Sequence, residues 1–350
     1  MNVTMPAPEF RAVRLIKPGS RLVNETLATP GPAAGDVVVR VMAAGICHSD
    51  AHYRSGVVST RHPCTLGHEV SGVVAQVGAD VTRVRPGDRV CLHYLVTCGK
   101  CSHCRTGTEQ FCVAGEIIGK HRDGGFAELI CVPAQNALPL PAAIPFEQGA
   151  ILMCSSATAL HALRKARVGR GDSVAVFGIG GLGVSAIQSA KAFGASAVFA
   201  VDINATKLAL AERLGAVPVD ANAADPVHEI RRLTGGHGVD ASLELIGSAQ
   251  TMEQAIEAVA PQGRAALAGL TDQRISVSPY RDILNKEAEI IGVSDHLASE
   301  IPELLGLVAC GQLDLAHAVS RVVPLDAYAI NGVLDDLENF RDDVRCVIKP

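Results

Sequence analysis

The feature that most constrains the fold is a glycine-rich turn between an apolar strand and a helix. Residues 173–177 form a continuous apolar strand, residues 178–183 read Gly-Ile-Gly-Gly-Leu-Gly, and apolar side chains then recur at helical spacing. In this context G-x-G-x-x-G predicts a dinucleotide site, because the glycines let a pyrophosphate approach the free N–H groups of the helix N-terminus. The residues predicted to line it are Gly178, Gly180, Gly181, Leu182 and Gly183.

The next strand, residues 197–201, ends at Asp202, about twenty residues after the glycine turn. A carboxylate at this position accepts hydrogen bonds from the adenosine ribose hydroxyls and repels a 2′-phosphate. Asp202 could instead cap a helix or form a turn, but the preceding motif favours the cofactor contact. We therefore expect NAD rather than NADP.

Further strands alternate with helices beyond this point, which predicts an α/β domain with a doubly wound parallel sheet of the Rossmann type. The additional strand candidates are residues 217–219, 239–245, 264–268 and 289–293. Residues 10–145 differ, because short β-branched runs are separated by Gly, Pro and Asp. That pattern predicts an all-β, barrel-like domain, and the change near Phe146 marks a domain boundary.

A cysteine-rich segment in the β-rich part has the spacing C-x2-C-x2-C-x7-C. Four thiolates this close can complete a tetrahedral shell around zinc, which leaves no position for water and indicates a structural site. A metal-free cluster, disulfides and an iron-sulfur site are the alternatives. The ligands predicted for this structural zinc are Cys98, Cys101, Cys104 and Cys112.

A second candidate metal site begins at residues 47–52, Cys-His-Ser-Asp-Ala-His. No ordinary core segment needs a thiol, a hydroxyl, a carboxylate and two imidazoles together. His68 lies just before a predicted strand at 70–77, where a lone histidine is more often structural. Cys47 upstream favours a metal ligand instead, and Asp50 could orient the His68 ring through its second nitrogen.

Charge and cysteine content limit the partners and the compartment. The net charge is -5 and no long basic run occurs, which argues against nucleic acid or a membrane surface and favours a small-molecule substrate. The eleven cysteines are odd in number and several have metal-ligand spacing, which suits a reducing compartment. The N-terminus also lacks the features of a secretory signal, so we expect a cytoplasmic protein.

Together these motifs resemble the zinc-containing medium-chain alcohol dehydrogenases, from about residue 10 to the C-terminus. The resemblance implies a GroES-like catalytic domain formed by residues 1–154 and 295–350, and a Rossmann domain formed by residues 155–294. It also implies an NAD-dependent enzyme that interconverts a primary or secondary alcohol with an aldehyde or ketone, with one catalytic and one structural zinc per chain. By analogy with similar enzymes, a homotetramer is favoured over a dimer.

The resemblance also assigns roles to individual residues. Cys154 falls at the step of the third catalytic zinc ligand after Cys47 and His68. Polyol dehydrogenases generally have glutamate there, so cysteine favours the alcohol dehydrogenase branch. Ser49 and His52 match the first and last groups of a proton path. The resemblance also places Asp50 and Glu69 beside the zinc ligands. It assigns His48 and Arg345 to the cofactor pyrophosphate and Lys207 to cofactor binding.

Two alternatives stay open. One is a polyol or other specialised dehydrogenase, since residues 53–62 and the loop at 293–296 depart from similar bacterial and yeast enzymes. The other is a protein that retains the dinucleotide fold without catalysis, because fold does not imply function. The number of bound zinc ions would help to separate the second alternative from an enzyme.

Overall fold

The computed structural model describes residues 8–339 and 345–350 and contains two compact units. Unit 1 comprises Met1–Cys154, Leu297–Ile301 and Leu315–Pro350; unit 2 comprises Ser155–His296 and Pro302–Asp314. The expected division placed all of 295–350 in the first domain, whereas the structure places Pro302–Asp314 in unit 2. One reason is Gln188, whose amide nitrogen donates to the Asp314 carbonyl at 2.9 Å and whose oxygen accepts from the Asp314 N–H at 2.8 Å.

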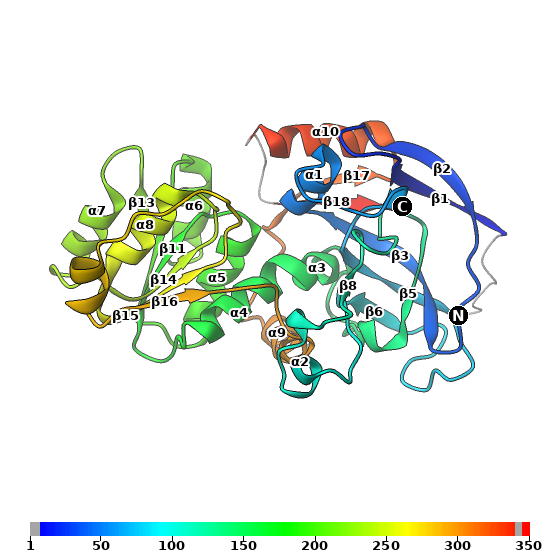
Figure 1. Ribbon diagram of the computed structural model, residues 1–350, viewed down its shortest axis with the longest axis horizontal. Coiled ribbons are helices and arrows are strands. Elements are labelled where there is room, and N and C mark those ends of the chain that lie inside the picture. Colours follow the sequence, from blue (N-terminus) through cyan, green and yellow to red (C-terminus); the bar gives the residue numbers. More distant parts are fainter. Residues whose placement is uncertain (1–7, 340–344) are drawn as a thin grey trace. The chain divides into compact units, whose positions relative to one another are not determined.

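Unit 2 contains a six-stranded parallel sheet in the order β13-β12-β11-β14-β15-β16, the doubly wound order that the sequence predicts. Helices cover both of its faces (Figure 1). The strands are β11 (Ser173–Phe177), β12 (Ala197–Asp202), β13 (Val217–Asp220), β14 (Val239–Glu244), β15 (Val259–Leu267) and β16 (Glu289–Gly292). The helices are α4 (Ala157–Lys165), α5 (Gly181–Ala192), α6 (Ala205–Arg213), α7 (Pro226–Leu233), α8 (Ala249–Ala258), α9 (Ile301–Ala309, which starts in unit 1) and the π-helix η4 (Pro279–Leu284).

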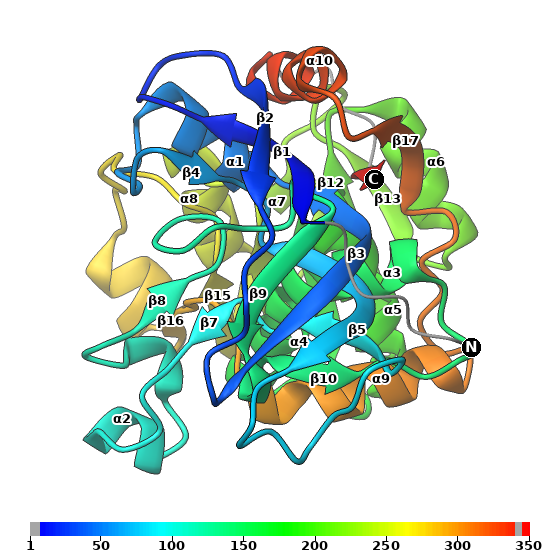
Figure 2. The ribbon, with the colours of Figure 1, turned by 90° about the vertical axis from the view of Figure 1, so that its right-hand side faces the viewer.

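Unit 1 is built on a mostly antiparallel seven-stranded sheet with the path β10-β6-β5-β3-β18-β17 and with β9 paired to β3 (Figure 2). A smaller sheet has the order β2-β1-β4, and β7 pairs with β8. The strands are β1 (Glu9–Leu15), β2 (Val23–Ala28), β3 (Asp36–Ile46), β4 (Cys64–Thr65), β5 (Glu69–Val77), β6 (Arg89–Leu92), β7 (Leu95–Val96), β8 (Glu116–Ile117), β9 (Leu129–Pro133), β10 (Ala137–Pro139), β17 (Val319–Pro324) and β18 (Arg345–Lys349). The C-terminal strand β18 thus lies next to β3, which leads directly to Cys47.

The sequence pattern predicts an all-β domain, but unit 1 also contains helices between its strands. Helix α1 (His48–Ser55) is preceded by the N-cap residue Cys47, whose backbone N–H donates to the Asp50 carboxylate at 2.9 Å. Cysteine is not a usual N-cap residue, so the capping pattern was missed. The other helical segments are α2 (Ser102–Arg105), η1 (Glu109–Phe111), η2 (Ala134–Asn136), α3 (Phe146–Ile151), the π-helix η3 (Leu152–Ser156, which ends in unit 2), η5 (Ala298–Glu300) and α10 (Ala327–Glu338).

Two strand boundaries also differ from the sequence pattern. Strand β9 begins at Leu129 rather than at Phe126, because the Phe126 N–H bonds the Leu66 carbonyl instead of a neighbouring strand of the large sheet. Strand β15 begins at Val259, earlier than expected. Among the described residues, no helix combines the length and apolar character needed to cross a membrane.

Candidate metal and dinucleotide sites

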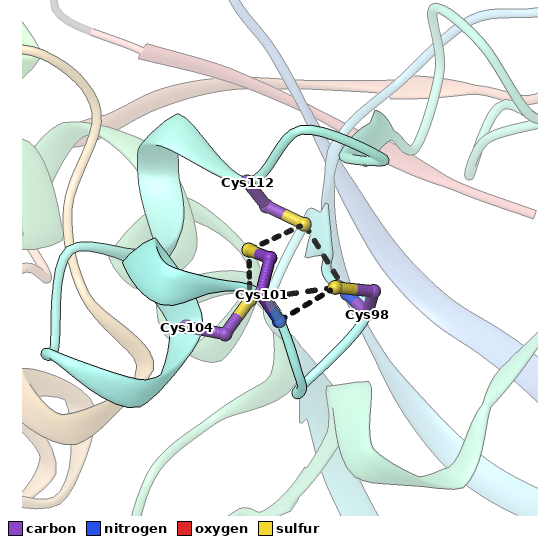
Figure 3. Close-up of side chains that lie close together, drawn as sticks. All are labelled: Cys98, Cys101, Cys104 and Cys112. Atoms are coloured by element: carbon purple, nitrogen blue, oxygen red, sulfur yellow. Dashed lines mark hydrogen bonds between the residues drawn. The ribbon is translucent and has the colours of Figure 1, made fainter.

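The four cysteines of the 98–112 loop converge on one point between α2 and η1 (Figure 3). The Sγ of Cys101 lies 3.5 Å from that of Cys104 and 3.9 Å from that of Cys112, and Cys98 lies 3.9 Å from Cys104. A tetrahedron of thiolates with Zn–S bonds of about 2.3 Å has S···S edges of about 3.8 Å. Disulfide bonds, at about 2.05 Å, do not match these separations. The donor set therefore fits a structural zinc.

Backbone N–H groups favour thiolates in this loop. The Cys98 N–H points to the Cys112 Sγ at 3.3 Å, and the Cys101 N–H points to the Cys98 Sγ at 3.4 Å. Hydrogen bonds from the backbone of Cys104 and Val113 lower the pKa of Cys101 to about 6. The pKa of Cys98 is also lowered, whereas burial and the neighbouring thiols raise that of Cys104 to about 12, so the thiolate that binds a metal is favoured at Cys98 and Cys101.

A second cluster brings together residues from three distant segments. Cys47 joins β3 to α1, His68 and Glu69 lie at the start of β5, and Cys154 lies in the π-helix η3; their ligand atoms all fall within 4.8 Å of one another. Cys47, His68 and Cys154 are 7%, 3% and 8% exposed. Among the described residues, the cluster offers two thiols, one imidazole and the Glu69 carboxylate, which pairs with Arg345; two thiols and an imidazole are the donor set of an open zinc site. π-Helical turns such as η3 frequently occur at functional sites.

Neighbouring groups in this cluster favour the thiolate form of Cys47 and the protonated form of His68. The pKa of the Cys47 thiol lies well below its ordinary value, chiefly because Cys154 hydrogen-bonds to it, and despite the opposing effect of burial. Burial lowers the pKa of His68, but the Asp50 carboxylate and Cys47 outweigh this and raise it to about 10. Asp50 Oδ1 lies 3.6 Å from His68 Nδ1. The predicted pairing of Asp50 with His68 thus has a geometric basis.

Glu69 and Arg345 form an ion pair inside the same cluster. Arg345 is placed there because β18 pairs with β3, with Cys346 opposite Ile46. Gly45 provides the space for the carboxylate, since a Cβ at this position would fall 2.0 Å from Glu69 Oε2. The predicted contact of Arg345 with a cofactor pyrophosphate stays a prediction.

Helix α1 carries the residues of the predicted proton path. The Cys47 thiol is 3.8 Å from the Ser49 hydroxyl, and the rings of His48 and His52 are 5.7 Å apart. All three of Ser49, His48 and His52 are partly exposed. Burial and the neighbouring His48 lower the pKa of His52, which keeps its imidazole neutral and able to accept a proton near pH 7.

The glycine turn of unit 2 has the shape that a pyrophosphate needs. Gly178 has a φ of +96°, and a Cβ at Gly183 would fall 2.1 Å from the Gly178 carbonyl oxygen, so the helix packs tightly on the turn. At Gly180, by contrast, a Cβ would point into open space at the N-cap of α5. A phosphate could occupy that space and accept bonds from the N-terminal N–H groups. The predicted turn therefore fits a dinucleotide.

Asp202 lies beside this turn at the end of β12. Its carboxylate accepts hydrogen bonds from the Ile179 N–H at 2.7 Å and from the Asn204 N–H at 2.9 Å. Lys207 lies in the first helical turns of α6, which follows directly. The side chain of Ile203 is 67% exposed, so an apolar surface adjoins the carboxylate.

Two residues near these sites were not predicted. The ring of Tyr94, which lies between β6 and β7, meets that of His68 edge-on, with centroids 5.2 Å apart, but a tyrosine in an apolar stretch carries no sequence signal. Glu244 is fully buried at the end of β14 and accepts bonds from the N–H groups of Ile246 and Gly247 at 2.9 and 2.8 Å. A carboxylate ending an apolar strand at the ligand-binding edge of the sheet could have identified it.

Comparison with known proteins finds relatives for both units of the chain. Residues 33–142 match the family model of the alcohol dehydrogenase GroES-like domain, and residues 181–309 match that of zinc-binding dehydrogenases. An NAD-dependent alcohol dehydrogenase of Sulfurisphaera tokodaii is 33% identical over 97% of this chain and 100% of its own. A sorbitol dehydrogenase of Bacillus subtilis is 30% identical over 90% and 89% of the two chains.

A solved structure is similar throughout its length. A zinc-binding dehydrogenase of Sinorhizobium meliloti 1021, determined with NADP bound, superposes with a TM-score of 0.91 at 31% identity, covering 98% of this chain and 100% of the other. These matches establish an oxidoreductase with a GroES-like and a Rossmann domain, for which NAD(P) and zinc are the expected cofactors. The chain belongs to the zinc-containing medium-chain alcohol dehydrogenase family.

Proposed function

We propose that this protein is an NAD-dependent alcohol dehydrogenase that oxidises primary or secondary alcohols to aldehydes or ketones, or catalyses the reverse. The observation that carries the proposal is the convergence of Cys47, His68 and Cys154 at one buried point, with Ser49 beside it. When bound, zinc supplies a Lewis acid that makes an alcohol more acidic, and oxidised nicotinamide supplies a hydride acceptor. The residues of the chain position these groups and carry the proton away.

A screen for alcohol-dependent NADH formation over short, branched, aromatic and polyol substrates tests the activity. The alternative of a polyol dehydrogenase is supported by the similarity to a sorbitol dehydrogenase, whereas Cys154 supports the alcohol dehydrogenase branch. A preference for polyols over all simple alcohols would replace the proposal with this alternative. A chain that binds only the cysteine-loop zinc and reduces no NAD would favour a non-catalytic protein.

Proton transfer can be tested at His52. Its lowered pKa means that the neutral, proton-accepting form prevails above that pKa, and that activity falls as the pH drops through it. We expect His52→Gln to remove this acidic limb from the pH profile of alcohol oxidation and to slow hydride transfer about 100-fold. His237→Gln, at an exposed histidine of unit 2, is the matched control. An unchanged profile with a near-normal rate of hydride transfer would remove His52 from the path.

Cofactor preference can be tested at Asp202. Asp202→Asn keeps the shape and an acceptor for the Ile179 N–H but removes the charge, so kcat/KM for NAD should fall by about 10-fold, while discrimination against NADP weakens. Asp220→Asn is the matched control, because Asp220 lies opposite Asp202 at the end of the adjacent parallel strand. A wild-type enzyme with a higher kcat/KM for NADP than for NAD would contradict the expected preference.

The proposal includes a homo-oligomer, with a tetramer favoured over a dimer. Strand β16 supports self-association, since it is the last strand of the sheet in unit 2 and Ile290 on it is 39% exposed. No nucleic-acid or membrane partner is proposed.

A further inference from the structure

Helix α1 is a short platform for the residues of the proposed proton path. It has eight residues, and an isolated helix of this length is not stable in water. Its inward face carries Asp50 and Arg54, one turn apart and 0% and 6% exposed, whereas His48, Ser49 and His52 are partly exposed. The position of His52 therefore depends on what holds the two ends of the helix.

Asp50 holds the first end and Arg54 the second. Asp50 accepts hydrogen bonds from the N–H groups of Cys47 at 2.9 Å and Gly67 at 3.2 Å. The Arg54 guanidinium contacts three residues of α10, which lies next to α1 in unit 1 (Figure 1). These contacts are to Asp335 Oδ1 at 2.7 Å, Glu338 Oε2 at 2.8 Å, and the carbonyl and side-chain oxygens of Asn331 at 3.2 and 3.4 Å.

Without ion pairing between α1 and α10, the charged side chains on both helices would be unfavourable for folding. Carboxylates in the last turn of a helix oppose the helix dipole, so Asp335 and Glu338 are poorly placed for α10 alone. A buried guanidinium without partners is more unfavourable still. The ion pairs of Arg54 with Asp335 and Glu338 offset both costs and fix α1 against α10.

Glu338 also acts on the histidine. Among the described residues, Cys47, at the start of α1, and Glu338, on α10, favour the protonated form of His52 and so raise its pKa, whereas His48 on α1 lowers it. Arg54 is the direct counter-charge of Glu338. Loss of Arg54 would thus leave the Glu338 charge uncompensated near His52 and release the last turn of α1.

We propose that Arg54 is a positioning residue for proton transfer: by tying α1 to Asp335 and Glu338, it sets both the place of His52 and the charge that His52 faces. The inference rests on the proposed role of His52 in the reaction. Arg54 itself touches neither substrate nor metal in this assignment.

The test compares variants of the zinc-loaded, full-length enzyme. The titration of His52 is followed by NMR, with His52→Gln to assign its signal, and the pH profile of hydride transfer is measured in parallel. For Arg54→Met we expect His52 to titrate at higher pH and hydride transfer at neutral pH to fall about 10-fold. Arg54→Lys should recover part of the loss, and Glu338→Gln should move the titration to lower pH.

Arg21→Met is the matched control, because Arg21 pairs with the other oxygen of Asp335 at 3.0 Å but is 63% exposed and lies outside α1. Its titration and pH profile should superpose on those of the wild type. A zinc-loaded Arg54→Met protein with the wild-type titration and profile would overturn the inference.

If Arg54→Met does not fold, Glu338→Gln decides, since an unchanged His52 titration in that variant also overturns the inference. Failure of the wild type to oxidise any alcohol would refute the proposed function separately, because the NMR titration needs no turnover.

Discussion

Replacement of Cys47 by alanine is expected to lower alcohol oxidation by about 1,000-fold or more, because the loss of a ligand removes the Lewis acid, which is worth several kcal/mol of transition-state stabilisation. Cys47 is one of two thiols in the buried cluster, and its lowered pKa favours the thiolate that binds a metal. Zinc content should fall from about two ions per chain to about one. Metal analysis and steady-state kinetics on the same sample check both expectations.

Cys91→Ala is the matched control for a buried cysteine. Its thiol lies in β6, burial raises its pKa to about 12, and it points to the Leu138 carbonyl instead of the metal cluster. This variant should keep both zinc ions and wild-type kinetics. A Cys47→Ala enzyme that retains two zinc ions and near-normal activity would show that the buried cluster is not the catalytic centre.

Replacement of Cys101 by serine is expected to lower the melting temperature by about 10 °C. Binding of zinc at a thousandfold excess over its Kd stabilises a fold by roughly 4 kcal/mol, and each kcal/mol corresponds to about 2–4 °C in a domain of about 150–250 residues, a range that includes unit 1. Cys101 is central to the loop, since its Sγ lies within 3.9 Å of those of Cys104 and Cys112. Calorimetry with metal analysis measures the change.

Limited proteolysis should locate that loss of order in the 97–115 loop. Cys310→Ser, at an exposed cysteine of unit 2, is the control and should change neither zinc content nor melting temperature. A Cys101→Ser protein with one zinc ion fewer but an unchanged melting temperature would contradict a structural role for the loop metal.

Local patterns explain why much of both sites could be predicted from the sequence. The glycine turn at 178–183 and the 98–112 cysteines act within short segments, so their spacing alone determines what they can bind. The predicted strand 173–177 coincides with β11, and the parallel order of the sheet follows from alternating strands and helices. The family resemblance, rather than spacing, supplied Cys154.

The features that could not be predicted from the sequence depend on contacts between residues far apart in the chain. Arg345 lies in the metal cluster only because β18 pairs with β3, two strands about 300 residues apart. Arg54 could not be distinguished from an ordinary surface arginine until its partners on α10 were known. The transfer of Pro302–Asp314 to unit 2 likewise depends on side-chain contacts such as those of Gln188, which no periodicity reveals.

The absence of a side chain at Gly45 determines which charged groups can lie beside the predicted zinc ligands. A methyl group at position 45 of β3 would collide with the Glu69 carboxylate. Glycine at this position therefore allows Glu69 and its ion-pair partner Arg345 to lie beside the two thiols. A change from glycine to alanine would alter the charge balance there while leaving every ligand in place. A substitution outside the predicted zinc ligands can therefore change the charges beside Cys47, His68 and Cys154.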